Sequence, residues 1–169
     1  MDDCLFFSQS NEVIHALTKT TFKLKDEGDV SAFLGVQIQK DPTTRTITFT
    51  QPGLIDQILR DLNLTAFSKT KETPSDSILH ADVHGPDRLE TWNYRSVVGK
   101  LNYLANHTRP DISMAVHQCA RFCKAPRALR KLVVKRIGRY LLATKDKGMI
   151  LRPNRTFNLD MYVDADFAG

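Results

Sequence analysis

The feature that most constrains the fold is a series of three apolar stripes at helical spacing in the second half of the chain. The stripes run through residues 94–107, 110–124 and 126–144. Apolar residues that recur every three to four positions predict amphipathic helices. Pro110 and Pro126 begin the second and third segments, where the fixed φ of proline suits a first helical turn. Three such helices with short connections predict a small helical bundle.

The first part of the chain mixes helix and strand patterns. Residues 11–24 carry apolar side chains at helical spacing, and residues 52–64 do so behind a proline. Between them, residues 32–39 and 44–51 alternate apolar and polar side chains, and the intervening DPTTR is typical of a turn. We therefore predict a helix and a β-hairpin followed by a second helix, and an α+β chain overall.

The periodic patterns stop between residues 65 and 92, where Ser, Asp, Thr, His and Pro dominate. A stretch of this length without periodicity is typical of a linker or a long loop. It divides the chain into residues 1–64 and a helical part, residues 93–147. Residues 148–169 then return to strand patterns, and we expect them to form a loose terminal strand pair.

Charge is distributed unevenly along the chain. Residues 1–92 carry 9 Lys and Arg against 14 Asp and Glu, whereas residues 93–169 carry 15 against 5. A surplus of positive charge in one half points to a polyanionic partner, most simply a nucleic acid. A solvated basic face is the alternative explanation, and charge alone leaves both open.

The remaining composition excludes several classes. Three cysteines without CxxC spacing favour a reducing compartment over a disulfide framework or a zinc site, and Cys119 and Cys123 lie on an apolar stripe as core residues do. No apolar run approaches a membrane span, and the acidic start lacks the basic region of a signal peptide. We expect an intracellular protein, cytoplasmic or nuclear, without membrane contact.

Acidic residues stand at both ends of the chain. Asp2 and Asp3 precede an apolar run, and Asp164 follows an alternating strand pattern. Carboxylates at strand edges suit Mg²⁺, which prefers oxygen ligands and acts on phosphates. Taken alone, a pair of aspartates is far more often an ordinary acidic start, so the residue types by themselves favour no metal site.

Gly99 falls in the middle of a predicted helix, where glycine costs about 1 kcal/mol relative to alanine. Arg95, Asn102, Tyr103 and Asn106 lie around it, opposite the apolar stripe. An arginine, amides and an aromatic ring around a small residue suit a nucleic-acid groove. Packing of another helix against Gly99 explains the same glycine equally well.

Several stretches, in order, resemble a known family. The most specific are YRSVVGKLNYLANHTRPDISMAVHQCARFCKAP, KRIGRYLLATKDKGMIL and YVDADFAG. With MDD, KLKDEGDVSAFLGVQIQKD, TITFTQPGLIDQIL and Thr73-Pro74, they resemble the polymerase polyprotein of copia-type retrotransposons. The resemblance covers essentially the whole chain. The sequence departs from the family at Arg130 and Lys131, where a histidine and a tryptophan are usual, and at Gly138.

The resemblance implies a domain layout. Residues 1–64 would be a palm remnant with a primer-grip-like hairpin and the first connecting helix, and residues 65–92 a linker. Residues 93–147 would be a thumb-like helical bundle. Residues 148–169 would be the truncated start of ribonuclease H.

The resemblance also implies site residues. Asp2 and Asp3 match the aspartates of the polymerase hairpin and Asp164 matches the first catalytic aspartate of ribonuclease H, so all three would bind Mg²⁺. The nucleic-acid contacts would come from a primer grip and from a thumb helix that follows the minor groove. The primer-grip residues are Phe33, Leu34 and Gly35, and the thumb residues are Arg95, Gly99 and Tyr103.

The implied function is that of a fragment of a copia-type reverse transcriptase, an RNA-directed DNA polymerase, which holds an RNA–DNA or DNA primer–template duplex. Each active site keeps only part of its carboxylates, so we expect no polymerisation or cleavage by the chain alone. In a longer polyprotein, the missing polymerase and ribonuclease H segments would be its partners. The alternatives are a non-enzymatic basic nucleic-acid-binding module and a non-functional transposon relic.

Overall fold

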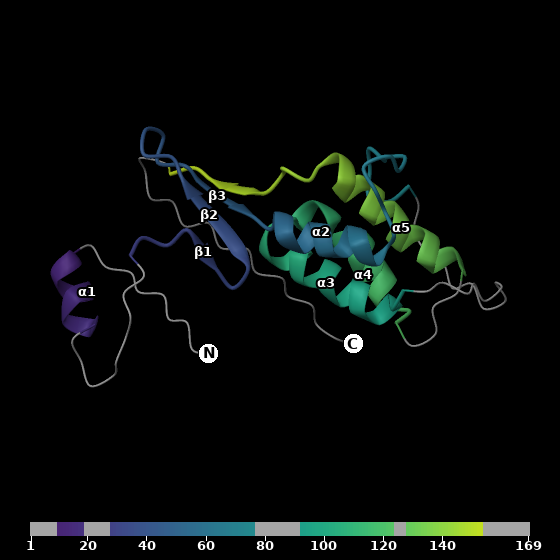
Figure 1. The fold of residues 1–169 in the computed structure, drawn as a ribbon, viewed down its shortest axis with the longest axis horizontal. Helices are drawn as coiled ribbons and strands as arrows, with labels where there is room; N and C mark the ends of the chain where they lie inside the picture. Colours follow the sequence, from purple (N-terminus) through teal and green to yellow (C-terminus); the bar gives the residue numbers. More distant parts are fainter. Residues whose placement is uncertain (1–9, 19–27, 77–91, 124–127, 154–169) are drawn as a thin grey trace, which may run out of the picture.

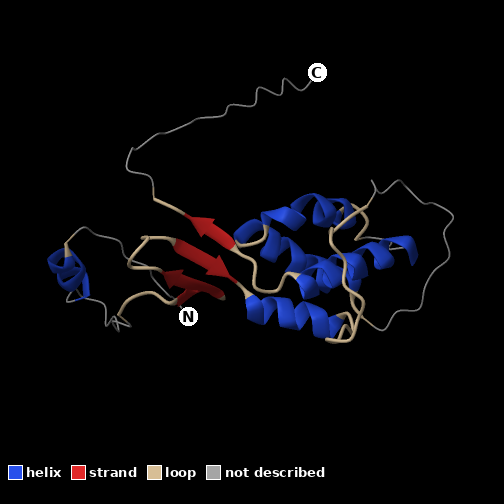
Figure 2. Ribbon diagram, turned by 90° about the horizontal axis from the view of Figure 1, so that it is seen from above, coloured by secondary structure: helices blue, strands red, loops and turns tan. Residues whose placement is uncertain are grey.

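The computed structural model describes residues 10–18, 28–76, 92–123 and 128–153. The strands form a sheet with a helical unit on one side of it, and the first helix lies apart on the other side (Figure 1, Figure 2). Within the described ranges, no helix is both long and apolar enough to span a membrane. The elements in order are α1 (Asn11–Thr18), β1 (Ala32–Phe33), β2 (Val36–Lys40), β3 (Ile47–Thr50), α2 (Pro52–Asp61), α3 (Tyr94–His107), the 3₁₀ turn η1 (Pro110–Ile112), α4 (Ser113–Ala120), α5 (Ala128–Ala143) and β4 (Met149–Leu151).

Helices α2 to α5 share one hydrophobic core. Ile58 from α2, Leu101 from α3, Val116 from α4 and Ile137 from α5 are all fully buried in the same cluster. The apolar stripe of α2, which the predicted layout groups with residues 1–64, is buried against α3 and α5. Among the described residues, the helical unit contains four α-helices, α2 to α5.

Helix α3 begins where the sequence predicts it. The Asn93 side chain accepts a hydrogen bond from the backbone N–H of Ser96 at 3.0 Å, which satisfies a donor left open at the helix start. The predicted helix over residues 110–124 is divided in the structure, since η1 forms the first turn and α4 ends at Ala120.

The strands form one antiparallel sheet in the order β1-β2-β3-β4. The alternation of residues 32–39 predicts a single strand. In the structure the chain reverses at Leu34 and Gly35, so that β1 pairs with β2 and Phe33 lies opposite Val36. Both turn residues have positive φ, 48° and 75°, as a type I′ turn requires. Glycine adopts this conformation freely, whereas for leucine it is a strained exception.

The turn between β2 and β3 is held by Asp41. Its carboxylate accepts hydrogen bonds from the Thr44 hydroxyl at 2.6 Å and from the backbone N–H of Thr43 at 2.8 Å. These bonds stabilise the ionised form and lower the pKa of Asp41. The turn chemistry of DPTTR thus joins two antiparallel strands in register, with Ile38 opposite Phe49.

Strand β4 pairs with β3, so that Ile47 lies opposite Leu151. In the predicted layout, residues 148–169 instead form a strand pair at the start of a separate domain. The structure differs because Gly148 lets the chain after α5 approach β3 closely, where a Cβ atom would overlap the Phe49 carbonyl oxygen. The second predicted strand falls within residues 154–169, outside the described residues.

Gly138 marks the contact between α5 and the end of α2. A Cβ atom there would lie 2.6 Å from Leu62 Cδ1 and 2.7 Å from Leu64 Cδ1, and the Leu62 side chain is fully buried. Gly138 is one of the positions at which the sequence departs from the family that it resembles. The packing explains it, since α5 and the α2 terminus approach closely at this point.

This contact predicts opposite effects of alanine at two helical glycines. Gly138→Ala should lower the free energy of unfolding by about 1 kcal/mol, because the fully buried Leu62 side chain has no free space to move into. The resulting overpacking costs roughly 1–3 kcal/mol and outweighs the gain in helix propensity. Gly99→Ala, where a Cβ meets nothing within 4 Å, should raise it by about 1 kcal/mol. Urea unfolding of both variants measures the two signs, and a stabilised Gly138→Ala would contradict the packing argument.

Candidate nucleic-acid interface

The outer face of α3 carries the residues predicted to contact nucleic acid. Arg95, Gly99 and Tyr103 recur every four positions and are all exposed, and Asn102 and Asn106 are exposed beside them. The opposite face of the helix is buried in the core. Residues spaced by four lie one above another on a helix, so this face is a continuous surface about two turns long.

Gly99 lies in open space. A Cβ atom at this position would meet no other atom within 4 Å, so no described element packs against it. The explanation by helix packing is therefore wrong for the part of the chain that the structure describes. A glycine that costs about 1 kcal/mol and has no such packing leaves the helix backbone accessible to a partner.

Tyr103 connects this face to the β1–β2 turn. Its hydroxyl donates a hydrogen bond to the Leu34 carbonyl oxygen at 2.8 Å, across 69 residues of sequence. The Tyr103 ring also packs on His107, with ring centroids 4.1 Å apart. The structure therefore brings together two of the segments that the resemblance assigned to nucleic-acid contact.

The turn itself is presented to solvent. Leu34 is 60% exposed and Gly35 is exposed, whereas Phe33 is half-buried at the end of β1. Because the left-handed conformation of Leu34 is strained, the hydrogen bond from Tyr103 helps to fix its carbonyl group. Leu34 and Gly35 thus extend the α3 face.

The predicted metal ligands are not part of this face. Asp2, Asp3 and Asp164 lie outside the described residues. Within the described ranges, no three His, Cys, Asp or Glu side chains gather closely enough to hold a metal ion. The described residues thus offer no site that fits Mg²⁺, and its binding by the three aspartates stays a prediction.

Two basic residues of α5, Arg130 and Arg136, are engaged in contacts within the chain. Arg130 is 6% exposed, and its guanidinium group lies 3.7 Å from the centroid of the Phe122 ring. Arg136 forms an ion pair of 2.7 Å with Asp76. Arg130 and Arg136 are therefore held by contacts within the protein and do not belong to a freely solvated face.

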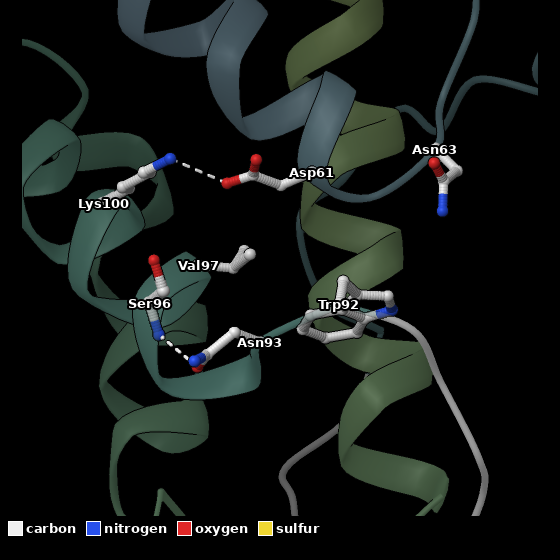
Figure 3. A pocket seen from close by; sticks show the side chains of 7 residues that line it. All are labelled: Asp61, Asn63, Trp92, Asn93, Ser96, Val97 and Lys100. Atoms are coloured by element: carbon white, nitrogen blue, oxygen red, sulfur yellow. Dashed lines mark hydrogen bonds and ion pairs between the residues drawn. The ribbon is translucent and has the colours of Figure 1, made fainter.

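A polar cleft of about 350 Å³ lies between the end of α2 and the start of α3 (Figure 3). Trp92 and Val97 form part of its wall, and Lys100 reaches across to Asp61 at 2.8 Å. This cleft lies on the flank of α3 rather than on its outer face. The ion pair therefore joins α2 to α3 beside the candidate interface.

Sequence reasoning missed a buried network around Arg109. The Arg109 side chain is only 1% exposed and forms two hydrogen bonds with Asp111, at 2.9 and 2.7 Å. It also donates to the backbone carbonyl and the hydroxyl of Thr144, while the Tyr140 hydroxyl donates to Asp111 at 2.6 Å. The network joins the turn between α3 and α4 to the end of α5, and so it supports the helix that carries the candidate interface.

This network affects ionisation. Burial opposes the charged form of Asp111, but the hydrogen bonds from Arg109 and Tyr140 outweigh it and hold the pKa of Asp111 below its ordinary value. The only part of this network that stands out in the sequence is the motif TRPD, residues 108–111, which contains Arg109 and Asp111 and lies within the most specific stretch of the resemblance. Nothing in the sequence alone connects it to residues 140–144.

The buried cysteine belongs to the core. Cys119 is fully buried, as its position on the apolar stripe predicts, and burial raises the pKa of its thiol to about 12. The Tyr94 hydroxyl donates to the Cys119 carbonyl oxygen at 3.0 Å, which joins α3 to α4. Cys123 is half-buried and is a free thiol like Cys119.

Comparison with known proteins finds relatives along the whole chain. It is 32% identical over 173 residues to the retrovirus-related Pol polyprotein from transposon RE1 of Arabidopsis thaliana, of which it spans 12%. It is 32% identical over 172 residues to an uncharacterized mitochondrial protein of the same plant, covering 70% of it. It is 30% identical over 169 residues to a putative transposon Ty5-1 protein of Saccharomyces cerevisiae, covering 54% of it. No family model and no solved structure matches the chain.

Proposed function

Because this chain belongs to the family of retrotransposon Pol polyproteins, we propose that it is part of a copia-type reverse transcriptase and holds the primer–template duplex. The chain spans about an eighth of the Pol polyproteins that it matches. The observation that carries the proposal is the hydrogen bond from Tyr103 to Leu34. It joins the turn that resembles a primer grip to the helix that resembles a groove-tracking thumb helix.

The exposed groups suit the two kinds of contact that a duplex offers. The guanidinium group of Arg95 would bind a backbone phosphate, and the aromatic ring of Tyr103 would lie against a sugar or a base edge. Gly99 between them would allow the sugar–phosphate backbone to approach the helix. This glycine has no side chain, and a Cβ atom built on it would meet no other atom within 4 Å. The face would therefore bind with little dependence on base sequence.

The proposal predicts that charge reversal at Arg95 weakens duplex binding. Arg95→Glu should raise the Kd for a labelled RNA–DNA duplex about tenfold at moderate salt and lower the salt-dependence slope by about 1, since one phosphate contact is lost. Gly99→Gln should weaken binding while preserving the helix, because glutamine is a good helix former but occupies the open space. Fluorescence anisotropy at several salt concentrations gives both quantities.

A matched control is Arg45→Glu, which makes the same charge change at the exposed β2–β3 turn. This variant should lose little affinity, because the turn lies at the far end of the sheet from α3 (Figure 1). If both charge reversals weaken binding equally, the chain responds only to net charge and the α3 face is not the interface.

A general nucleic-acid-binding module is the second candidate, favoured by the surplus of basic residues after residue 92. The two candidates differ in the ligand that they prefer. A reverse-transcriptase part should prefer a primer–template duplex to single strands of equal length. A general module should bind both with similar affinity and similar salt dependence.

A further inference from the structure

The segment that follows α2 is fastened to α5. Residues 65–76, the first part of the predicted linker, lie beside this helix (Figure 1). The backbone N–H of Lys71 donates to the Arg139 carbonyl oxygen at 3.4 Å. Arg136 donates to the Thr73 hydroxyl at 3.0 Å and pairs with Asp76 at 2.7 Å. We call residues 65–76 the strap.

The Arg136 guanidinium group holds the strap with only part of its donors. Its Nη1 contacts Asp76 and its Nη2 contacts the Thr73 oxygen, whereas its Nε is buried and has no hydrogen-bond partner among the described residues. The Nε of Arg139, one turn further along α5, is in the same state. Buried donors without partners are rare, and each requires an explanation.

The unused donor lies beside the used one. In a guanidinium group, Nε–H and the nearer N–H of Nη2 point from the same edge, and this edge binds two oxygens of a phosphate in parallel. The Thr73 oxygen already lies against Nη2. A phosphoryl group carried by that oxygen would bring further oxygens to the same edge, within reach of Nε.

The sequence around Thr73 fits a modifying enzyme. Thr73 is exposed and is followed by Pro74, and no other serine or threonine of the 169 residues precedes a proline. Kinases that are proline-directed select a serine or threonine with proline at the next position. The proposed function does not use this motif.

We propose that Thr73 is a phosphorylation site and that Arg136 is the receptor for its phosphate. A proline-directed kinase would transfer the γ-phosphoryl group of a nucleoside triphosphate to Thr73 Oγ1. The new P–O bond forms as the bond to the β-phosphate breaks, the hydroxyl proton passes to the base of the kinase, and a nucleoside diphosphate leaves. The product carries a charge of about −1.5 to −2 and binds Arg136 more strongly than the neutral hydroxyl does.

The first experiment tests the modification. The purified chain is incubated with a proline-directed kinase and MgATP, and the phosphorylated residue is located by mass spectrometry. We expect one phosphate at Thr73 and none in Thr73→Ala. A chain that remains unmodified at Thr73 in its folded state would overturn the proposal.

The second experiment tests the receptor. Limited trypsin cleavage after Lys69 and Lys71 reports release of the strap, and phosphorylation should slow it about tenfold if the phosphate adds charge-assisted hydrogen bonds. In Arg136→Gln, the phosphate should still be incorporated but the protection should be lost. This variant also separates protection from any direct effect of the phosphate on trypsin.

A third variant keeps the test decisive if Arg136→Gln fails to fold. Asp76→Asn leaves Arg136 in place and removes the carboxylate that competes for it. Phosphorylation should protect the strap of this variant at least as strongly as in the unchanged chain. Equal cleavage with and without phosphate, in both the unchanged chain and Asp76→Asn, would overturn the receptor role.

Discussion

Replacing Arg109 with alanine is expected to lower the free energy of unfolding by about 3 kcal/mol. The arginine is almost completely buried, and four hydrogen bonds join it to Asp111 and Thr144. Its removal leaves a cavity, an unpaired Thr144 carbonyl group and a carboxylate without its cation. We take the lower end of the range for broken buried pairs because the Asp111 side chain is 38% exposed. Urea unfolding at neutral pH measures the loss.

A matched control and a pH titration test the cause. Arg95→Ala removes an exposed arginine of neighbouring α3 and should change stability by less than about 0.5 kcal/mol. The pKa of Asp111 is lowered in the folded state, so ionised Asp111 stabilises the fold when the pH is above 3.8, the ordinary pKa of an aspartate. That contribution should disappear as the pH falls below 3.8 towards the folded pKa, and Arg109→Ala should lose it. An unchanged acid profile in the variant would contradict the network.

Replacing Gly148 with alanine is expected to separate β4 from β3 and to cost about 3 kcal/mol, the upper end for overpacking. The added Cβ would overlap the Phe49 carbonyl oxygen and lie 2.7 Å from Thr50 Cγ2. The carbonyl group belongs to the central part of the sheet and cannot turn away as a flexible side chain could. Amide hydrogen exchange in Met149–Leu151 should therefore accelerate by more than tenfold, alongside the fall in stability.

The control for this prediction is Gly53→Ala in the first turn of α2. A Cβ there meets nothing within 4 Å, so the variant should be as stable as the unchanged chain or slightly more stable. If Gly148→Ala keeps the slow exchange of β4, then β4 does not depend on the close approach that Gly148 provides.

Local signals in the sequence were sufficient to predict the helices around the candidate interface. The apolar stripe of α3 and the Asn93 cap both act within a few residues, so the predicted bounds agree with the structure. The same periodicity places Arg95, Gly99 and Tyr103 on one exposed face. These features depend only on helical geometry, which the sequence pattern contains.

Features that depend on distant packing could not be predicted in the same way. The turn at Leu34 lacks the usual Asn-Gly or Asp-Gly signal, so its flanking alternation looks like one strand. The burial of α2 depends on α3 and α5, which begin more than 30 positions after α2 ends. The hydrogen bond between Tyr103 and Leu34 joins residues 69 positions apart, and no local pattern indicates it.

The pairing of β4 with β3 also constrains the order in which the chain can fold. Residues 47–49 and 149–151 are about 100 positions apart, whereas the strands of the β2–β3 pair are neighbours in sequence. Closing so long a loop is entropically costly until the intervening helices have packed. During synthesis, the first three strands can therefore assemble early, while the fourth must wait until α5 has left the ribosome. The sheet therefore begins with β1 to β3, at residues 32–50, and is completed only by β4, at residues 149–151.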